Sequence, residues 1–139
     1  MKKFDKSQRS GWRYYWAHWA AFQMVALTLG IWRPRHLFHD WYKPWLKMFG
    51  MPYSEIQYIH RHSSRHHLEY LELNNGTYFD WDSMIIDWEC SQYTKEACTR
   101  NARQKLEHIL NDYPNDEYNA YIKYMLRRYV EPRLTQLGL

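Results

Sequence analysis

Residues 14–30, YYWAHWAAFQMVALTLG, carry the clearest helical pattern in the chain. Apolar side chains recur there at steps of three and four residues, the spacing that places them on one face of an α-helix. The members of this stripe are Tyr14, His18, Ala21, Phe22, Val25 and Leu29. Gly30 follows the last of them and is a typical helix-ending residue. The pattern predicts a helix whose apolar face is buried in a core.

The same stretch has about the length of a membrane span and contains no charged residue from position 14 to 32. His18, Gln23 and Thr28 interrupt it, however, and basic residues flank it on both sides, so it has no orientation signal. We therefore expect a buried core helix and no membrane partner. The N-terminus is basic, but no small-residue cleavage pattern follows the apolar run, so we expect no signal peptide.

Helical spacing also dominates the rest of the chain, and no segment alternates convincingly as a strand. The predicted helices span residues 36–42, 45–49, 55–73, 80–91, 95–110 and 117–130. Pro34, Pro44, Pro52, the 74–76 Asn-Asn-Gly turn and the loop at 111–115 separate them. Ser54 and either Asp80 or Asp82 are candidate N-caps, and Ser63-Ser64 could interrupt the 55–73 helix. We predict one all-α domain over residues 1–139, a compact bundle of about six helices, with the site in residues 14–90 and C-terminal helices in 95–139.

The composition sets weak bounds on function. The formal net charge of +4 is spread along the chain, which suits a phosphate-bearing ligand without requiring one. Aromatic residues make up 19% of the chain and can fill a core while keeping polar handles. Cys90 and Cys98 lack metal-type spacing and are interpreted as reduced thiols, which favours a cytoplasmic location.

Two histidines in the first third of the chain are candidate ligands. His18 lies on the apolar stripe, where a buried imidazole needs a hydrogen-bond partner or a metal. The adjacent His39-Asp40 pair, if helical, would offer a nitrogen and an oxygen about 100° apart around one point. Lys43 would share the face of Asp40, where its ammonium could meet a substrate anion. His36 falls on that face too and is a weaker candidate.

Residues 59–70, IHRHSSRHHLEY, form a histidine-rich block. His62 and His66 are four residues apart and His60 and His67 are seven apart, so either pair shares a helical face. Glu69 could orient a histidine or act as a base. The alternative is a solvated basic patch that binds phosphate non-specifically.

Asp87 lies within the apolar segment 84–88, MIIDW. A carboxylate in such a segment is costly to bury unless it is paired or bound to a metal. Asp80 and Asp82 are better explained as helix caps.

The order of these motifs resembles the HD superfamily of metal-dependent phosphohydrolases, whose helical core binds metal through a His, a His-Asp pair and a distant Asp. That resemblance implies a first-metal set of His18, His39, Asp40 and Asp87. It implies a second-metal set of His62, His66 and His67, with His60 as a substitute for His62. The His-Asp-x-x-Lys form at 39–43 also resembles several two-metal members. The block at 60–70 followed by Asp87-Trp88 more closely resembles a small phage and bacterial family of unassigned function.

The resemblance implies hydrolysis of a nucleotide or other small phosphate ester with one or two divalent ions, such as Mn, Fe, Co or Zn. Lys43, Arg61 and Arg65 are the predicted phosphate-binding residues. The predicted catalytic residues are Asp40, Lys43 and Glu69.

Two alternatives stay open from the sequence. Some members of the same superfamily use a similar site with iron to oxidise small molecules with dioxygen, and imidazole and carboxylate ligands suit both metals. A non-catalytic, metal-containing binding protein is the other alternative. The last helix mixes Arg127-Arg128 with tyrosines, as nucleic-acid binders do, but its four-residue spacing favours ordinary packing. Nucleic acid is therefore not the favoured partner.

Overall fold

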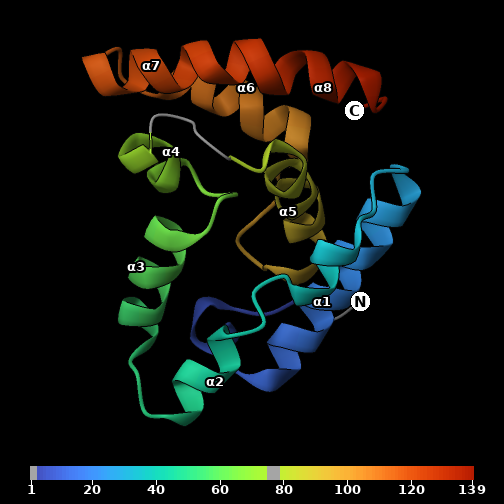
Figure 1. Ribbon diagram of the computed structural model, residues 1–139, viewed down its shortest axis with the longest axis vertical. Helices are drawn as coiled ribbons and strands as arrows, with labels where there is room; N and C mark the ends of the chain where they lie inside the picture. Colours follow the sequence, from blue (N-terminus) through green and yellow to red (C-terminus); the bar gives the residue numbers. More distant parts are fainter. Residues whose placement is uncertain (1–2, 75–78) are drawn as a thin grey trace.

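A computed structural model describes residues 3–74 and 79–139, with the backbone alone for 72–74. The described chain is helical and has no named strand, as the sequence predicts; Phe4 and Lys95 form one isolated bridge. The elements are η1 (Lys6–Gln8), α1 (Trp12–Thr28), η2 (Pro34–Phe38), α2 (Lys43–Met48), α3 (Tyr53–Ser63), α4 (Leu68–Asn74), α5 (Trp81–Thr94), α6 (Ala102–Asp112), α7 (Glu117–Met125), η3 (Leu126–Val130) and α8 (Glu131–Gln136). Figure 1 shows their arrangement.

Helix α1 has the buried face that the sequence predicts. The stripe from Tyr14 through His18 to Val25 is buried, and Phe22 is fully buried within it. The helix ends at Thr28, and Gly30 then adopts a φ of 70°, a left-handed conformation that glycine accepts without a steric cost.

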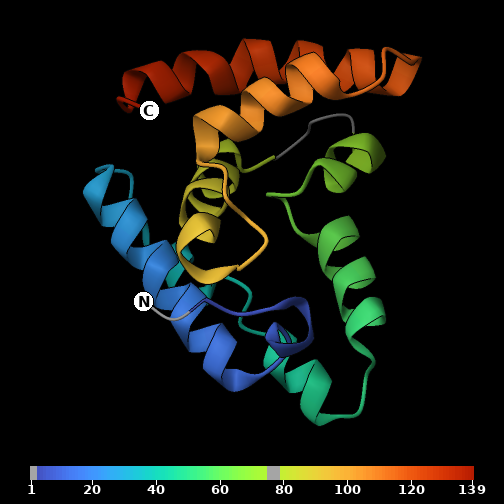
Figure 2. The ribbon, with the colours of Figure 1, turned by 180° about the vertical axis from the view of Figure 1, so that it is seen from behind.

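Helix α5 lies at the centre of the molecule because both of its sides are covered (Figures 1 and 2). Met84 and Ile85 belong to a core shared with the C-terminal helices, whereas Ile86 and Cys90 pack with α1 in a second core. Successive helical residues point about 100° apart, so the neighbouring isoleucines reach different cores. Asp87 follows them directly, and α5 therefore carries a buried carboxylate into the interior.

The C-terminal helices form a layer across one end of the molecule, in which α7, η3 and α8 run on as one rod above α6 (Figures 1 and 2). The helix predicted to end at Val130 continues through Pro132 to Gln136. A proline inside an α-helix removes a hydrogen bond and clashes with a preceding carbonyl. Here the preceding turn, η3, is a π-helix, whose wider spacing accommodates Pro132.

Three predicted helices are different in the structure. Residues 36–42 are not a helix: a 3-10 turn covers Pro34–Phe38, and α2 begins only at Lys43. The 55–73 segment is divided into α3 and α4, the first ending at Ser63. The 95–110 helix begins at Ala102, because the Asn101 side chain caps it there, and residues 95–101 form a loop.

Of the predicted helix N-caps, one is confirmed and one is wrong. Asp80 caps α5 by accepting a hydrogen bond from the Ser83 amide, as predicted. Ser54 does not cap α3, because the helix already begins at Tyr53 after Pro52. The Asn75-Gly76 part of the predicted turn lies outside the described residues. Among the described helices, none combines the length and the apolar character needed to cross a bilayer.

Candidate metal centre

The first group of candidate ligands joins α1 to α5. His18 Nε2 lies 2.9 Å from Asp87 Oδ1 and 3.3 Å from His39 Nε2, and His39 Nε2 lies 3.7 Å from the same Asp87 oxygen. All three side chains are buried. They are placed by the close packing of α1 on α5 and by the stacking of the His39 ring on Phe22, with ring centroids 3.8 Å apart.

The His39-Asp40 pair lies in a turn after η2, so the helical geometry expected for it is wrong. Asp40 has a φ of 55°, the one positive value among the described residues other than glycine. An L-residue pays a steric cost in this left-handed region, although aspartate tolerates it better than most. Strain of this kind persists where the surrounding structure enforces it, and it is common at functional sites.

The second group consists of His60 from the last turn of α3 and of His66 and His67 from the segment before α4. The Nε2 atoms of His60 and His67 lie 2.8 Å apart. The rings of His66 and His67 are adjacent, with centroids 4.5 Å apart. Each of the three histidines offers a nitrogen within 4.8 Å of the others.

His62 is not part of any such group among the described residues, and His60 occupies the position expected for it. The buried face of α3 carries Ile56 and His60, four residues apart. His62 lies two residues further, about 200° around the helix, on the other side. There its Nδ1–H donates to the Tyr58 carbonyl oxygen at 2.8 Å.

Asp40 lies between the two groups. Its Oδ2 is 3.5 Å from His39 Nε2, while its Oδ1 is 3.3 Å from His60 Nε2 and 3.6 Å from His66 Nε2. His39, Asp40 and His66 also form a ligand group of their own. One carboxylate therefore faces both histidine groups, as a carboxylate shared by two metal ions would.

The donor atoms fit a metal ion. Two nitrogen ligands of one tetrahedral ion, each about 2.0–2.1 Å from it, are separated by about 3.3 Å. The His18–His39 nitrogen separation is also 3.3 Å. Moreover, Asp40 Oδ1 and His66 Nε2 are buried and have no hydrogen-bond partner within the described structure. An unsatisfied buried polar atom costs about 1–3 kcal/mol, a cost that a bound cation would remove. These buried clusters could hold a metal ion.

Hydroxyl groups contact the outer nitrogens of two of the imidazoles. Thr94 Oγ1 lies 3.2 Å from His18 Nδ1, and the Tyr42 hydroxyl lies 2.6 Å from His60 Nδ1. Ser64 Oγ is also 3.0 Å from that His60 nitrogen. When each Nδ1–H donates to its hydroxyl, the Nε2 lone pair is left for a metal, the usual arrangement of ligating histidines.

The histidines of the second group are neutral at physiological pH. Burial lowers the pKa of His66 to about 4 and holds the pKa of His60 and His67 well below the usual range. Neutral imidazole is the form that binds metal. Little proton release is therefore needed for these side chains to act as ligands at neutral pH.

The two aspartates are ionised. Burial opposes ionisation of Asp40, but His39 and the Lys43 ammonium, whose Nζ lies 2.8 Å from Oδ2, hold its pKa well below the usual range. The pKa of Asp87 is likewise well below its usual range, because Lys95 and the hydrogen bond from His18 outweigh burial. The centre thus combines the neutral imidazoles of the second group with two carboxylates, a donor set that transition metals accept.

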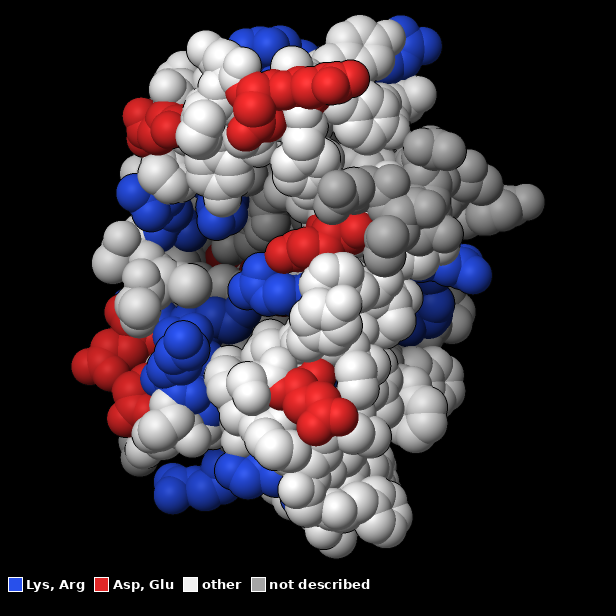
Figure 3. Space-filling model, turned by 90° about the vertical axis from the view of Figure 1, so that its left-hand side faces the viewer, with Lys and Arg blue, Asp and Glu red and all other residues white. Residues whose placement is uncertain are grey.

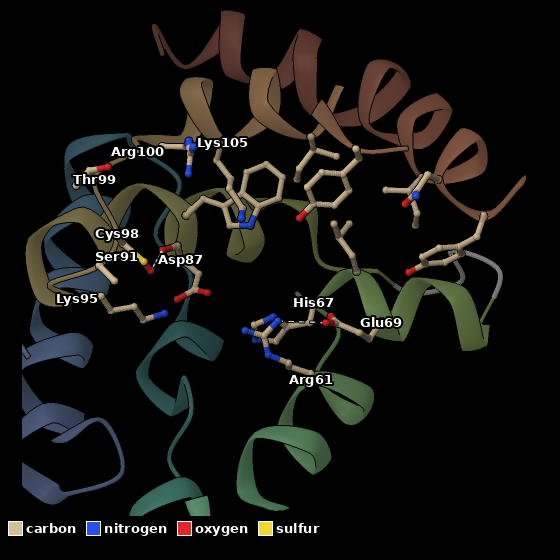
Figure 4. Close-up of a pocket in the computed structure, with 18 residues that line it drawn as sticks. Arg61, His67, Glu69, Asp87, Ser91, Lys95, Cys98, Thr99, Arg100 and Lys105 are labelled. Carbon is tan, nitrogen blue, oxygen red and sulfur yellow. Dashed lines mark hydrogen bonds and ion pairs between the residues drawn. The ribbon is translucent and has the colours of Figure 1, made fainter. Parts of the chain in front are cut away.

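A cavity of about 650 Å³ opens beside the centre, with His67 and Asp87 in its wall. Figure 4 shows that it lies between α4, α5 and the C-terminal helices. On the face seen in Figure 3, Lys and Arg side chains gather around a hollow. This volume is in the usual range for a small-molecule site. A small molecule in the cavity would reach the metal-ligand candidates directly.

The predicted phosphate-binding residues do not all reach this cavity. Arg61 and Glu69 line it and bond to each other at 3.2 Å. Lys43 is instead held by Asp40, with its Nζ 2.8 Å from Oδ2, and does not line the cavity. Arg65 is exposed and is not a lining residue either; its backbone carbonyl accepts the Asp80 amide.

The remaining sequence candidates lie away from the centre. His36 is buried, but its Nδ1 accepts the Arg33 amide in the turn that starts η2. Asp82 forms an ion pair with Arg133. On the last helices, Ile122, Leu126 and Val130 are buried in the core, whereas Arg127 and Arg128 are exposed.

Sequence reasoning missed several residues at the site, among them Tyr42, Thr94 and Lys95. Tyr42 and Thr94 contribute hydroxyls, which no spacing pattern indicates. Lys95 was assigned to a helix, whereas it begins the loop that forms one wall of the cavity. The four-residue step from Ile56 to His60 was the available signal that His60 faces inward.

Comparisons with known proteins give no relative. No protein-family model matches the chain, and searches of curated proteins and of solved structures return no match.

Proposed function

We propose that this protein is a metal-dependent phosphohydrolase that acts on a small phosphate ester at a His/Asp centre holding up to two divalent ions. The observation that carries the proposal is the convergence of five buried or half-buried histidines and two buried aspartates beside a cavity lined by cations. The order of these residues along the chain, with a His, a His-Asp pair, further histidines and a distant Asp, resembles that of the HD superfamily.

The two ions would be held by separate groups that share one carboxylate. His18, His39 and Asp87 would hold the first, and His60, His66 and His67 the second. Asp40 would contribute to both. Bound divalent ions supply a Lewis acid that polarises a phosphoryl oxygen and lowers the pKa of water from about 15.7 towards about 7.

The chain's own residues would bind the phosphate and move a proton. Arg61 and Lys95 line the cavity next to the metal-ligand candidates and would neutralise charge on phosphoryl oxygens. Glu69, which Arg61 holds in the cavity wall, could take a proton from the attacking water. Lys43 would not contact the substrate. Its ion pair with Asp40 would hold that carboxylate, and the strained backbone that carries it, in position.

Phosphate is the favoured chemistry because of the charges around the cavity. Among the described residues, its wall contains Arg61, Lys95, Arg100 and Lys105 and two carboxylates, of which Asp87 is a metal-ligand candidate and Glu69 is paired. A low-dielectric cavity with excess positive charge concentrates anions. A neutral substrate would gain nothing from this arrangement.

The first experiment measures the metal content of the purified protein beside His39→Ala and Asp87→Ala. His108→Ala and Asp112→Ala are matched controls, because these two residues pair with each other on α6 and belong to no metal-ligand group. We expect metal in the wild type and the controls and a loss of at least one ion in each site variant. Full occupancy in both site variants would remove the proposed centre.

The second experiment assays phosphate release from aryl phosphates and nucleoside monophosphates by protein loaded with Mn, Co or Fe. We expect turnover that chelation abolishes and that Glu69→Gln reduces. A metal-loaded protein that releases no phosphate from any of them is not a phosphohydrolase of this kind. Oxygen consumption by the iron form would assign it to the oxygenases instead.

A further inference from the structure

The cavity extends beyond the metal-ligand candidates to a second group of cations. Arg100 and Lys105 lie on the side of the cavity away from His67 and Arg61, and the Lys95 side chain extends toward Asp87 (Figure 4). We call Lys95, Arg100 and Lys105 the cationic wall. They come from the loop at 95–101 and the first turn of α6.

No side chain of the cationic wall is in direct contact with a described carboxylate. None of its three side chains forms an ion pair or side-chain hydrogen bond with a described residue, whereas Arg35, Arg61 and Arg133 each pair with a carboxylate. Burial lowers the Lys95 pKa, but Tyr14 and then Asp87 outweigh it and raise that pKa, although no ion pair joins Lys95 to either of them. Lys105 is half-buried, and its pKa is lowered by burial and by the charges of Arg100, Arg61 and Lys95. Such like-charge crowding is relieved by a bound anion.

The backbone that carries the cationic wall is anchored at both ends of the loop before any ligand arrives. The Phe4 amide donates to the Thr94 carbonyl at 2.8 Å, and the Glu96 amide donates to the Phe4 carbonyl at 3.0 Å, so the start of the loop is anchored. At its other end, Asn101 caps α6 and the Ala102 amide donates to Glu89. An anchored backbone adds little to the entropy lost on binding, which then falls on the Lys and Arg side chains.

We propose that Arg100 and Lys105 of the cationic wall bind a second anionic group of the substrate, while Lys95 serves the anion at the metal centre. The substrate class is then a small phosphate ester carrying two separated anions. This inference rests on the proposed function only for the anion at the metal centre, and the anion site at Arg100 and Lys105 does not depend on it. The cavity volume of about 650 Å³ exceeds the needs of a single phosphate group and leaves room for a two-ended ligand.

The first test needs no metal and no turnover. Chelator-treated, dialysed protein is titrated with inorganic phosphate by calorimetry at constant ionic strength. The variant Arg100→Gln/Lys105→Gln is compared with Lys6→Gln/Arg127→Gln, which removes the same charge from exposed positions outside the cavity. We expect saturable phosphate binding that is at least about tenfold weaker in the first double variant and unchanged in the second.

The second test uses metal-loaded protein and two substrates, propyl phosphate and propanediol bisphosphate. We expect a higher kcat/KM for the bisphosphate, and a ratio between the two substrates that falls about tenfold or more in Arg100→Gln/Lys105→Gln. Circular dichroism and the thermal midpoint of each variant show whether it is folded.

The outcomes separate the two proposals. Wild-type protein that binds no phosphate without metal, or a wall variant that binds it as tightly as the control variant, overturns the second-anion site whether or not the protein is a hydrolase. Phosphate binding that depends on the wall, with no hydrolysis of either substrate, keeps the anion site and overturns the hydrolase. Equal selectivity in the wild type and the wall variant overturns the two-anion substrate.

Discussion

Asp40→Asn is the substitution that most directly tests whether one carboxylate serves two metal ions. Asparagine has nearly the shape of aspartate and accepts the φ of 55° found at this position, so the turn should be kept. The negative charge is lost, and one of the two oxygens, which face His39 on one side and His60 and His66 on the other, becomes an amide nitrogen that cannot bind a metal. The affinity of both ions should therefore fall together.

The expected size follows from ligand linkage. At a metal concentration of about 100 times Kd, one bound ion stabilises the folded state by about 2.7 kcal/mol. Loss of the shared carboxylate should lower the affinity for each ion by about 100-fold. A change of this size is the upper end of the range for residues that only orient a ligand. The same metal concentration then equals the new Kd, and one bound ion stabilises the folded state by about 0.4 kcal/mol. The difference, about 2.3 kcal/mol per ion, corresponds to about 7 °C in Tm for a domain of this length.

The assay compares the metal-induced rise in Tm within each variant, so that changes in the stability of the metal-free protein cancel. Metal content is counted on the same samples. Asp82→Asn is the matched control, because Asp82 pairs with Arg133 outside the metal-ligand groups. We expect the full rise in the wild type and in the control, and most of it lost in Asp40→Asn. If Asp40→Asn keeps both ions and the full rise in Tm, Asp40 is not a shared ligand.

Three further predictions concern the site and the fold. His60→Ala should lose one metal ion, whereas His62→Ala should keep the wild-type content, because only His60 faces the centre; equal losses by elemental analysis would contradict this placement. Asp80→Asn should lower the free energy of urea unfolding at pH 7 by up to about 2 kcal/mol. Burial raises the Asp80 pKa, but hydrogen bonds from Arg35 and from Ser83 in the first turn of α5 outweigh it and lower that pKa from 3.8 to about 2. This contribution is present above pH 3.8 and is lost as the pH falls towards 2, so a penalty that persists below pH 2 would refute the assignment. Leu106→Ala, in the C-terminal core, should lower the unfolding free energy by about 2–5 kcal/mol, and a loss below 1 kcal/mol would show that the core is not packed as described.

Local sequence patterns were sufficient to predict which side chains are buried where a helix buries one face. The stripe of α1 predicted the burial of Tyr14, His18 and Phe22, and the apolar run of α5 predicted a buried carboxylate at Asp87. Both predictions depend only on the 3.6-residue repeat and on the cost of burying a polar group. The all-α fold class follows from the same repeat along the chain.

Predictions failed where the geometry depends on how a segment is held by the rest of the molecule. The His39-Asp40 pair was expected on a helix, but the chain there follows a 3-10 turn after Pro34 and gives Asp40 a left-handed backbone. The loop at 95–101 was expected to be helical, but it is anchored by pairing with Phe4, a contact more than 90 residues away in the sequence.

By itself, the sequence determined that the chain is helical, that His18 and Asp87 lie on apolar faces, and that imidazoles and carboxylates are present in the numbers a metal centre needs. The tertiary structure decided which of them meet. Packing of α1 on α5 brings His18 to Asp87, the turn at Asp40 directs one carboxylate to two histidine groups, and the inward face of α3 selects His60 over His62. It also placed Lys95, Arg100 and Lys105 around one cavity. The physical reason is that the helical repeat is a local property, whereas the distance between two ligand atoms depends on packing between segments far apart in the chain.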